Sequence, residues 1–161
     1  MTDFEIKPAR PDDVPLILWF IKELAVYEKM ADQVVATEEG LRETLFGERP
    51  GAEVIFAYSR GEAVGFALFF HNYSTFLGQR GLYLEDLYVK PEFRGHGFGR
   101  ALLSHLAKIA KERKCGRLEW WVLDWNEPAI KFYRSLGAAP MDEWTVYRVT
   151  GEALDKLASE R

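Results

Sequence analysis

Three glycines and two arginines gather in one short stretch, Arg94-Gly95-His96-Gly97-Phe98-Gly99-Arg100. The stretch follows an apolar segment with the composition of a strand and precedes a segment with helical spacing. Alternate glycines let the backbone approach a ligand without Cβ clashes. The start of a helix adds unpaired N–H groups and the positive end of the helix dipole. With the charges of Arg94 and Arg100, the pattern predicts a pocket for a pyrophosphate group.

The glycine spacing argues against two common phosphate-binding motifs. A P-loop needs Gly-Lys-Ser or Gly-Lys-Thr, and the sequence has neither. A dinucleotide fingerprint reads G-x-G-x-x-G, whereas this loop reads G-x-G-x-G. Glu119 follows Gly99 at the distance of a ribose-binding acid, but it falls inside an apolar strand and not at its end. The loop also comes late, after an antiparallel hairpin, and a Rossmann fold is therefore rejected.

The elements before this loop are a strand, two helices and a hairpin. Their apolar residues alternate in the strands and recur at helical spacing in the helices. Thr37 opens the second helix and Gly47 ends it. We expect a strand at 4–6, a helix carrying apolar residues from 16 to 25, a helix at 37–46, and strands at 54–58 and 63–70.

The elements from the last strand before the loop onward alternate strand and helix. We expect strands at 82–89, 118–123 and 144–149, and helices from 97 to 110, from 127 to 136 and at 152–158. Antiparallel strands followed by β-α-β units predict an α/β (mixed α+β) fold. Residues 1–161 would form one domain around a central twisted mixed sheet.

Composition excludes several classes of function. The chain has 161 residues, with 21 Lys plus Arg against 25 Asp plus Glu, and this balance gives no reason to expect nucleic acid as a partner. The single Cys115 allows no internal disulfide, and the three histidines lack metal-ligand spacing, so no metal is expected. Residues 1–5 do not resemble a signal peptide and no apolar run could span a bilayer. We expect a cytoplasmic protein with no membrane contact.

Several motifs together resemble one family. The loop Arg94-Gly-x-Gly-x-Gly99 resembles the acetyl-CoA pyrophosphate loop of the GNAT superfamily of N-acetyltransferases, and Asn126 to Tyr133, with Gly137 after it, resembles that superfamily's second cofactor segment. The diamine acetyltransferases, which include the spermidine/spermine enzymes and their thialysine-acetylating relatives, are similar in four more segments. These are Glu23-Leu24-Ala25-x-Tyr27-Glu28, Gly65-Phe66-Ala67, Tyr83-Leu84-Glu85-Asp86 and Trp125-Asn126-Glu127-Pro128.

The resemblance implies acetyl-CoA as co-substrate and assigns its contacts. The strand before the loop would splay from its neighbour and offer the free backbone groups of Leu87, Tyr88 and Val89 to the pantetheine arm and the acetyl oxygen. The loop would hold the pyrophosphate through Arg94, Gly95, His96, Gly97, Phe98, Gly99 and Arg100. The rest of the cofactor wall would come from Asn126, Glu127, Pro128 and Ala129.

The resemblance also implies the chemical roles. Tyr133 would be the general acid that protonates the leaving thiolate. Glu85 would anchor the amine or accept its proton through water, while its neighbour Asp86, pointing to the opposite face of the strand, would face a turn or solvent. Further amine contacts would come from Tyr27 and Glu28, and from one of the three residues Glu119, Trp120 and Trp121.

One loop departs from the polyamine enzymes, and other readings stay open. Ser74 stands where those enzymes have an acid and Phe76 where they have a tryptophan, which resembles the thialysine-type relatives and leaves room for an amino-acid-like amine. Acetylation of a protein lysine or amino terminus, and a non-catalytic acyl-CoA sensor, are the alternatives. The resemblance implies a homodimer, in which the apolar segment 144–149 would pair with a partner's sheet.

Overall fold

The computed structural model describes residues 3–160. These residues divide into two compact units, with the boundary between Leu123 and Asp124. The first unit is built on a five-stranded sheet in the order β1-β2-β3-β4-β5. The strands are β1 (Phe4–Pro8), β2 (Glu53–Ser59), β3 (Glu62–Ser74), β4 (Gln79–Val89) and β5 (Leu118–Trp120).

The sheet is mixed, as the sequence predicts. Strands β1 to β4 pair antiparallel, whereas β5 pairs parallel to β4. A parallel neighbour needs a crossover, which α3 (Phe98–Glu112) provides. The β4-α3-β5 unit therefore places the start of α3 directly after the carboxyl end of β4.

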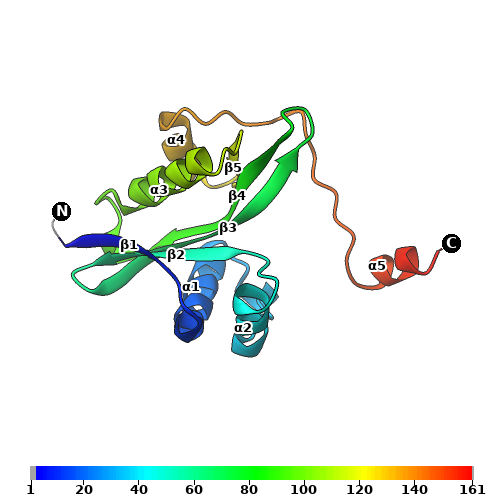
Figure 1. Cartoon of the computed structure of the whole chain (residues 1–161), viewed down its shortest axis with the longest axis horizontal. Coiled ribbons are helices and arrows are strands. Elements are labelled where there is room, and N and C mark those ends of the chain that lie inside the picture. The colour runs from blue at the N-terminus through cyan, green and yellow to red at the C-terminus, as the bar shows by residue number, and fades with distance from the viewer. Residues whose placement is uncertain (1–2, 161) are drawn as a thin grey trace. The chain divides into compact units, whose positions relative to one another are not determined.

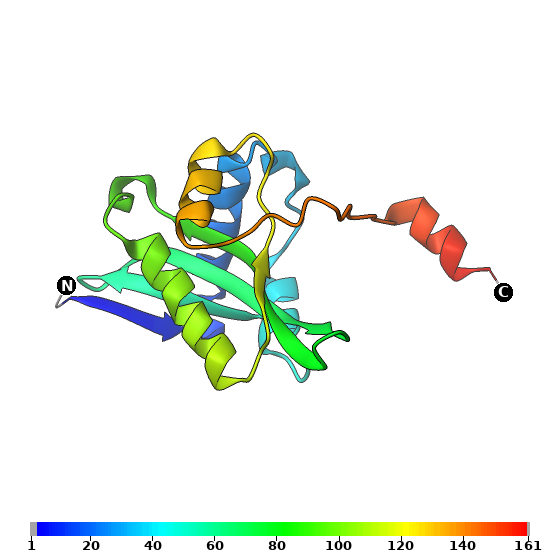
Figure 2. The ribbon, with the colours of Figure 1, turned by 90° about the horizontal axis from the view of Figure 1, so that it is seen from above.

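Helices cover both faces of the sheet (Figure 1). The helix α1 (Val14–Tyr27) and the shorter α2 (Glu38–Phe46) lie on one face, and α3 lies on the other. Thr37 caps α2 by accepting a hydrogen bond from the Gly40 N–H at 3.0 Å. Turning the molecule shows α3 running across the strands (Figure 2).

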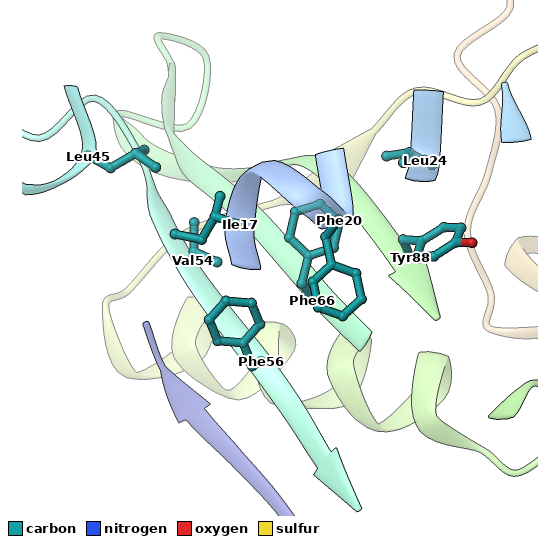
Figure 3. Close-up of a cluster of buried hydrophobic side chains, with 8 residues drawn as sticks. All are labelled: Ile17, Phe20, Leu24, Leu45, Val54, Phe56, Phe66 and Tyr88. Carbon is teal, nitrogen blue, oxygen red and sulfur yellow. The ribbon is translucent and has the colours of Figure 1, made fainter. Parts of the chain in front are cut away.

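The core between α1 and the sheet is aromatic. Phe20 of α1 stacks on Phe66 of β3 with ring centroids 5.0 Å apart. Tyr88 of β4 lies at one end of this cluster, with its hydroxyl oxygen directed away from both phenylalanines (Figure 3). Burial of such rings supplies most of the free energy that fixes a helix on a sheet. The cluster consists of Ile17, Phe20, Leu24, Leu45, Val54, Phe56, Phe66 and Tyr88.

Strand β4 carries a β-bulge at Glu85. Asp86 pairs with Leu68 and Leu84 pairs with Phe69, so Glu85 is an extra residue with no partner on β3. In an antiparallel pair, partners point to the same face of the sheet. Asp86 therefore shares the face of Leu68, which α1 covers. A regular strand would have turned Asp86 to the α3 face.

The second unit contains α4 (Glu127–Ser135) and α5 (Gly151–Ala158). Two predicted strands, one at the end of the first unit and one within the second, need correction. The predicted strand 118–123 ends at Trp120, and 144–149 is not a strand. The alternation in 144–149 does favour extended backbone, but a strand also needs a neighbour to bond its N–H and C=O groups. Among residues 3–160, no strand supplies one.

Candidate active site

The carboxyl end of β4 has a neighbouring strand on one side only. Strand β5 pairs with β4 only through Leu82, Tyr83 and Leu84. Strand β4 continues to Val89, still paired with β3 as far as the Gly65–Val89 position. Within residues 3–123, the backbone of 85–89 therefore has no strand on its β5 side. The three residues for which the resemblance implies a splayed strand, Leu87, Tyr88 and Val89, lie in this stretch.

The glycine loop connects this strand end to α3. Gly95 and Gly97 have φ angles of 79° and 85°, a conformation that residues with a Cβ rarely adopt. Gly97 is the N-terminal capping residue of α3, and a Cβ built on either glycine would meet nothing within 4 Å. The loop thus leaves open space beside the first N–H groups of α3, where an anionic group is favoured. Arg100 is exposed on the first turn of that helix.

Three carboxylates lie close enough at the bulge of β4 for their charges to interact. Glu28 directly follows α1, while Glu85 and Asp86 sit at the bulge of β4. Burial, and then the negative charges of Glu85 and Glu28, raise the pKa of Asp86 to about 7. Burial and the charge of Glu85 also raise the pKa of Glu28. A cation placed among these groups would relieve their mutual repulsion.

Asp86 is the functional candidate that the sequence reasoning missed. We expected Glu85 and Asp86 to point to opposite faces, with Asp86 toward a turn or solvent. That expectation is wrong, because the bulge turns Asp86 to the face of Leu68 and Asp86 is half-buried there. No residue of β4 is a glycine or proline at this point to mark the bulge in the sequence.

Aromatic side chains continue this face beyond the carboxylates. Tyr83 pairs with Phe70 on one side and with Glu119 on the other. Its ring contacts Phe70 at 5.0 Å and meets Trp121 edge-on at 5.8 Å. Burial and the charges of Glu85 and Glu119 raise the pKa of Tyr83, so its hydroxyl stays protonated and can donate a hydrogen bond.

The three candidates on β5 and after it separate by face. Glu119 shares the face of Tyr83 and accepts a hydrogen bond from Asn72 Nδ2 at 3.3 Å. Trp121 reaches the same face through its contact with Tyr83. Trp120 instead pairs with Leu84 and shares the opposite face. Glu119 and Trp121 therefore lie on the face of Tyr83, and Trp120 lies on the opposite face.

Tyr27 and Arg94 meet at the edge of this face. Tyr27 is the last residue of α1 and is about one-third exposed. The guanidinium carbon of Arg94 lies 5.2 Å from the centroid of the Tyr27 ring and 5.1 Å from that of Tyr88. Arg94 Nε also donates a hydrogen bond to the Val89 carbonyl oxygen at 2.9 Å. The ring of His96, by contrast, has its centroid 6.3 Å from that of Phe98.

The second unit carries the remaining candidates. Asn126 is the N-terminal cap of α4, since its Oδ1 accepts a hydrogen bond from the Ala129 N–H at 3.4 Å. Glu127 and Pro128 form the first turn of that helix, and Pro128 is favoured there because no N–H partner is needed. Tyr133 lies in the last turn of α4, and its ring is 5.7 Å from that of Phe132.

The loop that departs from the polyamine enzymes has a structural explanation for one of its two changes. Ser74 ends β3, is buried, and accepts a hydrogen bond at its Oγ from the Leu77 N–H at 3.2 Å. It therefore closes the β3–β4 turn. Phe76, at the tip of the same turn, is 91% exposed.

Residues 3–160 contain neither a metal-ligand cluster nor a membrane-spanning helix. No cluster of three or more His, Cys, Asp or Glu side chains there could hold a metal ion. No helix in the same residues is both long enough and apolar enough to cross a membrane.

Comparisons with known proteins agree on one family. The Acetyltransferase (GNAT) family profile matches residues 19–138. A thialysine N-epsilon-acetyltransferase of Bos taurus is 42% identical, over 96% of this chain and 97% of its own length. An L-ornithine N5-acetyltransferase of Arabidopsis thaliana is 34% identical, over 94% and 86% of the two chains. Among solved structures, an integron cassette protein from the mobile metagenome of V. cholerae superposes with a TM-score of 0.82, at 33% identity, covering 98% of this chain and 99% of its own.

Proposed function

The chain belongs to the GNAT family of acetyltransferases, and we propose that it moves the acetyl group of acetyl-CoA onto the terminal amine of a lysine-like amino acid such as thialysine. That it is an N-acetyltransferase of small-molecule primary amines follows from relatives that match it over nearly its whole length. Acetyl-CoA as the acetyl donor and a lysine-like amino acid as the acceptor are our proposals.

The observation that carries the proposal is the group of three carboxylates beside the splayed end of β4. An alkylammonium ion has an ordinary pKa of about 10, so the amine arrives as a cation that carboxylates attract, and a base must then accept its proton. Glu28, Glu85 and Asp86 supply that charge, and the exposed edge of Trp121 and the ring of Tyr83 border it. A compact site of this kind suits one amine on a short aliphatic stem.

The residues present fit an acyl-CoA. Open space beside the left-handed Gly95 and Gly97, at the start of α3, suits a pyrophosphate, and the unpaired β5 side of 85–89 suits the amides of a pantetheine arm. We propose contacts from the backbone of Leu87, Tyr88 and Val89 and from Gly95 through Arg100, with Asn126 to Ala129 completing the wall. Acetyl-CoA would supply the acetyl group as an activated thioester.

Two side chains would move protons in this scheme. Glu85 would accept the proton of the ammonium group, directly or through water, which makes the nitrogen nucleophilic. Tyr133 would donate its phenolic proton to the departing thiolate sulfur, and the second proton that the nitrogen loses on forming the amide would restore the phenol. Tyr27, Glu28, Glu119 and Trp121 would orient the amine, and no step requires Cys115.

Two other substrate classes are weaker fits. A polyamine carries several cations along its length, and the loop position where the polyamine enzymes have an acid is the buried Ser74, already engaged with Leu77 N–H. A protein lysine presents the same amine on a larger body. A sensor without catalysis would have no use for a proton donor such as Tyr133.

We also propose a cytoplasmic homodimer. Trp144 and Tyr147 are 74% and 91% exposed on the extended segment 144–149. Backbone and apolar side chains of this kind are commonly covered by a neighbouring strand. A second copy of the chain would provide that strand. The single cysteine fits a reducing compartment.

The proposal is tested by incubating the enzyme with acetyl-CoA and thialysine. Transfer is measured by the release of free CoA and by mass spectrometry of the amine. The wild-type enzyme should form N-acetylthialysine, and Glu85→Gln should raise the amine KM and lower kcat. Glu92→Gln, an exposed acid after β4, is the matched control and should leave both constants near wild type. Absence of acetylated amine with the wild-type protein, under conditions where acetyl-CoA binds, would overturn the proposed function.

A further inference from the structure

One arginine ties together the three elements around the site. Arg94 stands in the loop between β4 and α3, and its side chain reaches back over the strand end. Its Nε donates to the Val89 carbonyl at 2.9 Å, and its guanidinium lies over the rings of Tyr27 and Tyr88 at 5.2 and 5.1 Å. One side chain thus contacts the end of α1, the end of β4 and, through its own backbone, the glycine loop.

The rings of Tyr88 and Tyr27 differ in how deeply they are buried. Tyr88 is 6% exposed and belongs to the aromatic core under α1. Tyr27, on the last residue of α1, is 36% exposed. The guanidinium therefore contacts a buried ring on one side and a partly exposed ring on the other. Holding the same cation restricts where the Tyr27 ring can lie.

Position of Tyr27 matters because of its neighbour. Glu28 follows it directly, and Arg94 contacts both Tyr27 and Tyr88, so the end of α1 lies beside the end of β4. Burial and the charge of Glu85 raise the pKa of Glu28. A shift of the Tyr27 ring or of the helix end would change the shape of the amine site.

Only arginine has the chemistry for these contacts. Its planar guanidinium stacks on aromatic faces and keeps several N–H donors in fixed directions, whereas a lysine ammonium is a strongly hydrated point charge. With Nε committed to the Val89 carbonyl, Arg94→Lys keeps the charge of the loop but loses both the planar stacking and this bond geometry.

We propose that Arg94 is a positioning residue for the amine substrate, which acts by holding the Tyr27 ring between the end of α1 and the end of β4. This inference builds on the proposed function, and it adds to Arg94 a role beyond its charge near a pyrophosphate. It makes amine affinity depend on a residue of the cofactor loop.

A double-mutant cycle on the purified full-length enzyme tests this inference. Arg94→Lys, Tyr27→Leu and the combined variant are compared for the thialysine KM, for kcat, and for CoA affinity by calorimetry. Because Arg94 acts through Tyr27, Arg94→Lys should raise the amine KM about 5- to 30-fold, the range of one cation–π contact. In the Tyr27→Leu background the same change should add almost nothing. Tyr27→Phe keeps the ring and should keep the full effect of Arg94→Lys.

Arg42→Lys is the matched control, because Arg42 is an exposed arginine of α2 and belongs to neither the cofactor loop nor the amine site. Its effect on amine KM should be small and should add to that of Tyr27→Leu. Additive effects of Arg94→Lys and Tyr27→Leu, or a change in CoA affinity with an unaltered amine KM, would overturn the inference while leaving the proposed function intact. A wild-type enzyme without transfer to thialysine would overturn both.

Discussion

At the scale of single residues, the electrostatic cost of the proposed site is concentrated on Asp86. Burial beside Glu85 and Glu28 raises its pKa to about 7, so near neutral pH it exists as a mixture of acid and carboxylate. A folded protein does not gain stability from such a group. Its retention next to Glu85 is explained if the site must bind a cation, since a bound ammonium would lower the repulsion among the three carboxylates.

The raised pKa of Asp86 makes stability depend on pH. Between pH about 4 and pH 7 the folded protein holds a proton that the unfolded chain has already released. Stability therefore falls as pH rises through this window and then levels off. Asp86→Asn removes the penalty, and it should raise the free energy of unfolding at pH 8 by about 1–3 kcal/mol with little change at pH 4.

Urea unfolding of both proteins at the two pH values measures this difference. Asp142→Asn, an exposed acid in the second unit, should change neither value. The same Asp86→Asn variant should bind thialysine more weakly. An equal stability gain at pH 4 and pH 8 would show that ionisation of Asp86 is not the cause.

Tyr133 is tested by removing its phenolic oxygen alone. Tyr133→Phe keeps the ring next to Phe132 and should leave the thermal midpoint near wild type. CoA affinity should also change little, whereas kcat should fall by about two to four orders of magnitude, the usual value of general acid catalysis. Steady-state kinetics beside a calorimetric CoA titration separate these quantities. Turnover near the wild-type rate in the folded variant would make Tyr133 a packing residue.

Residue types and motifs predict which side chains would do the chemistry, but they do not predict where an irregular strand places those side chains. Glu85 and Glu28 are named by the sequence, and the structure places them close enough for their charges to interact. The predicted face of Asp86 was wrong, because strict alternation assumes that each residue of β4 pairs with one residue of β3. A single extra residue at a bulge reverses the face of the residues that follow it.

At the scale of elements, the start of α3 combines a conformational requirement with a binding role. Gly97 caps the helix at a φ of 85°, where a residue with a Cβ is strained, although nothing lies within 4 Å of that Cβ position. The glycine is therefore needed for the direction of the backbone, and not because the protein crowds it. The same backbone sets where the first N–H groups of α3 point.

A pair of glycine variants separates the two roles. Gly97→Ala and Gly61→Ala should each cost about 1–2 kcal/mol of stability, because Gly61, in the β2–β3 turn, has a similar φ of 79° and equally open space. Only Gly97→Ala should weaken CoA binding, by about tenfold or more. Chemical unfolding and calorimetry measure the two effects. Equal CoA affinity in both variants would contradict a binding role for this loop.

Prediction of elements succeeded where a segment carries its own signal. Helical spacing and the Thr37 cap identify α1, α2 and α3, and the hairpin turn at 60–61 identifies β2 and β3. The segment 144–149 has the alternation of a strand without being one, since pairing depends on a neighbour that the same sequence does not contain within residues 3–160. Local sequence thus predicts backbone conformation better than it predicts partners.

At the scale of the whole molecule, the family match at 19–138 crosses the boundary between the two compact units at 123–124. The prediction of a single domain over residues 1–161 stays a prediction. So does the homodimer, for which the exposed apolar side chains of 144–149 are the main support.

The homodimer is tested by blocking strand pairing on the segment 144–149. Light scattering at micromolar concentration should give a dimer mass for the wild type and for Val146→Thr, which keeps both the β-branched side chain and the N–H group. Val146→Pro removes that N–H and should shift the mass toward the monomer. A wild-type monomer, or a Val146→Pro dimer as stable as the wild type, would count against this interface.

The most direct test of the account compares kcat/KM for thialysine, spermidine and a lysine-containing peptide with one preparation of the wild-type enzyme and acetyl-CoA. Three carboxylates around one amine position, without an acid in the 73–78 loop, predict that thialysine is preferred over both of the others by about tenfold or more. A higher kcat/KM for spermidine or for the peptide would contradict the lysine-like amine as the substrate.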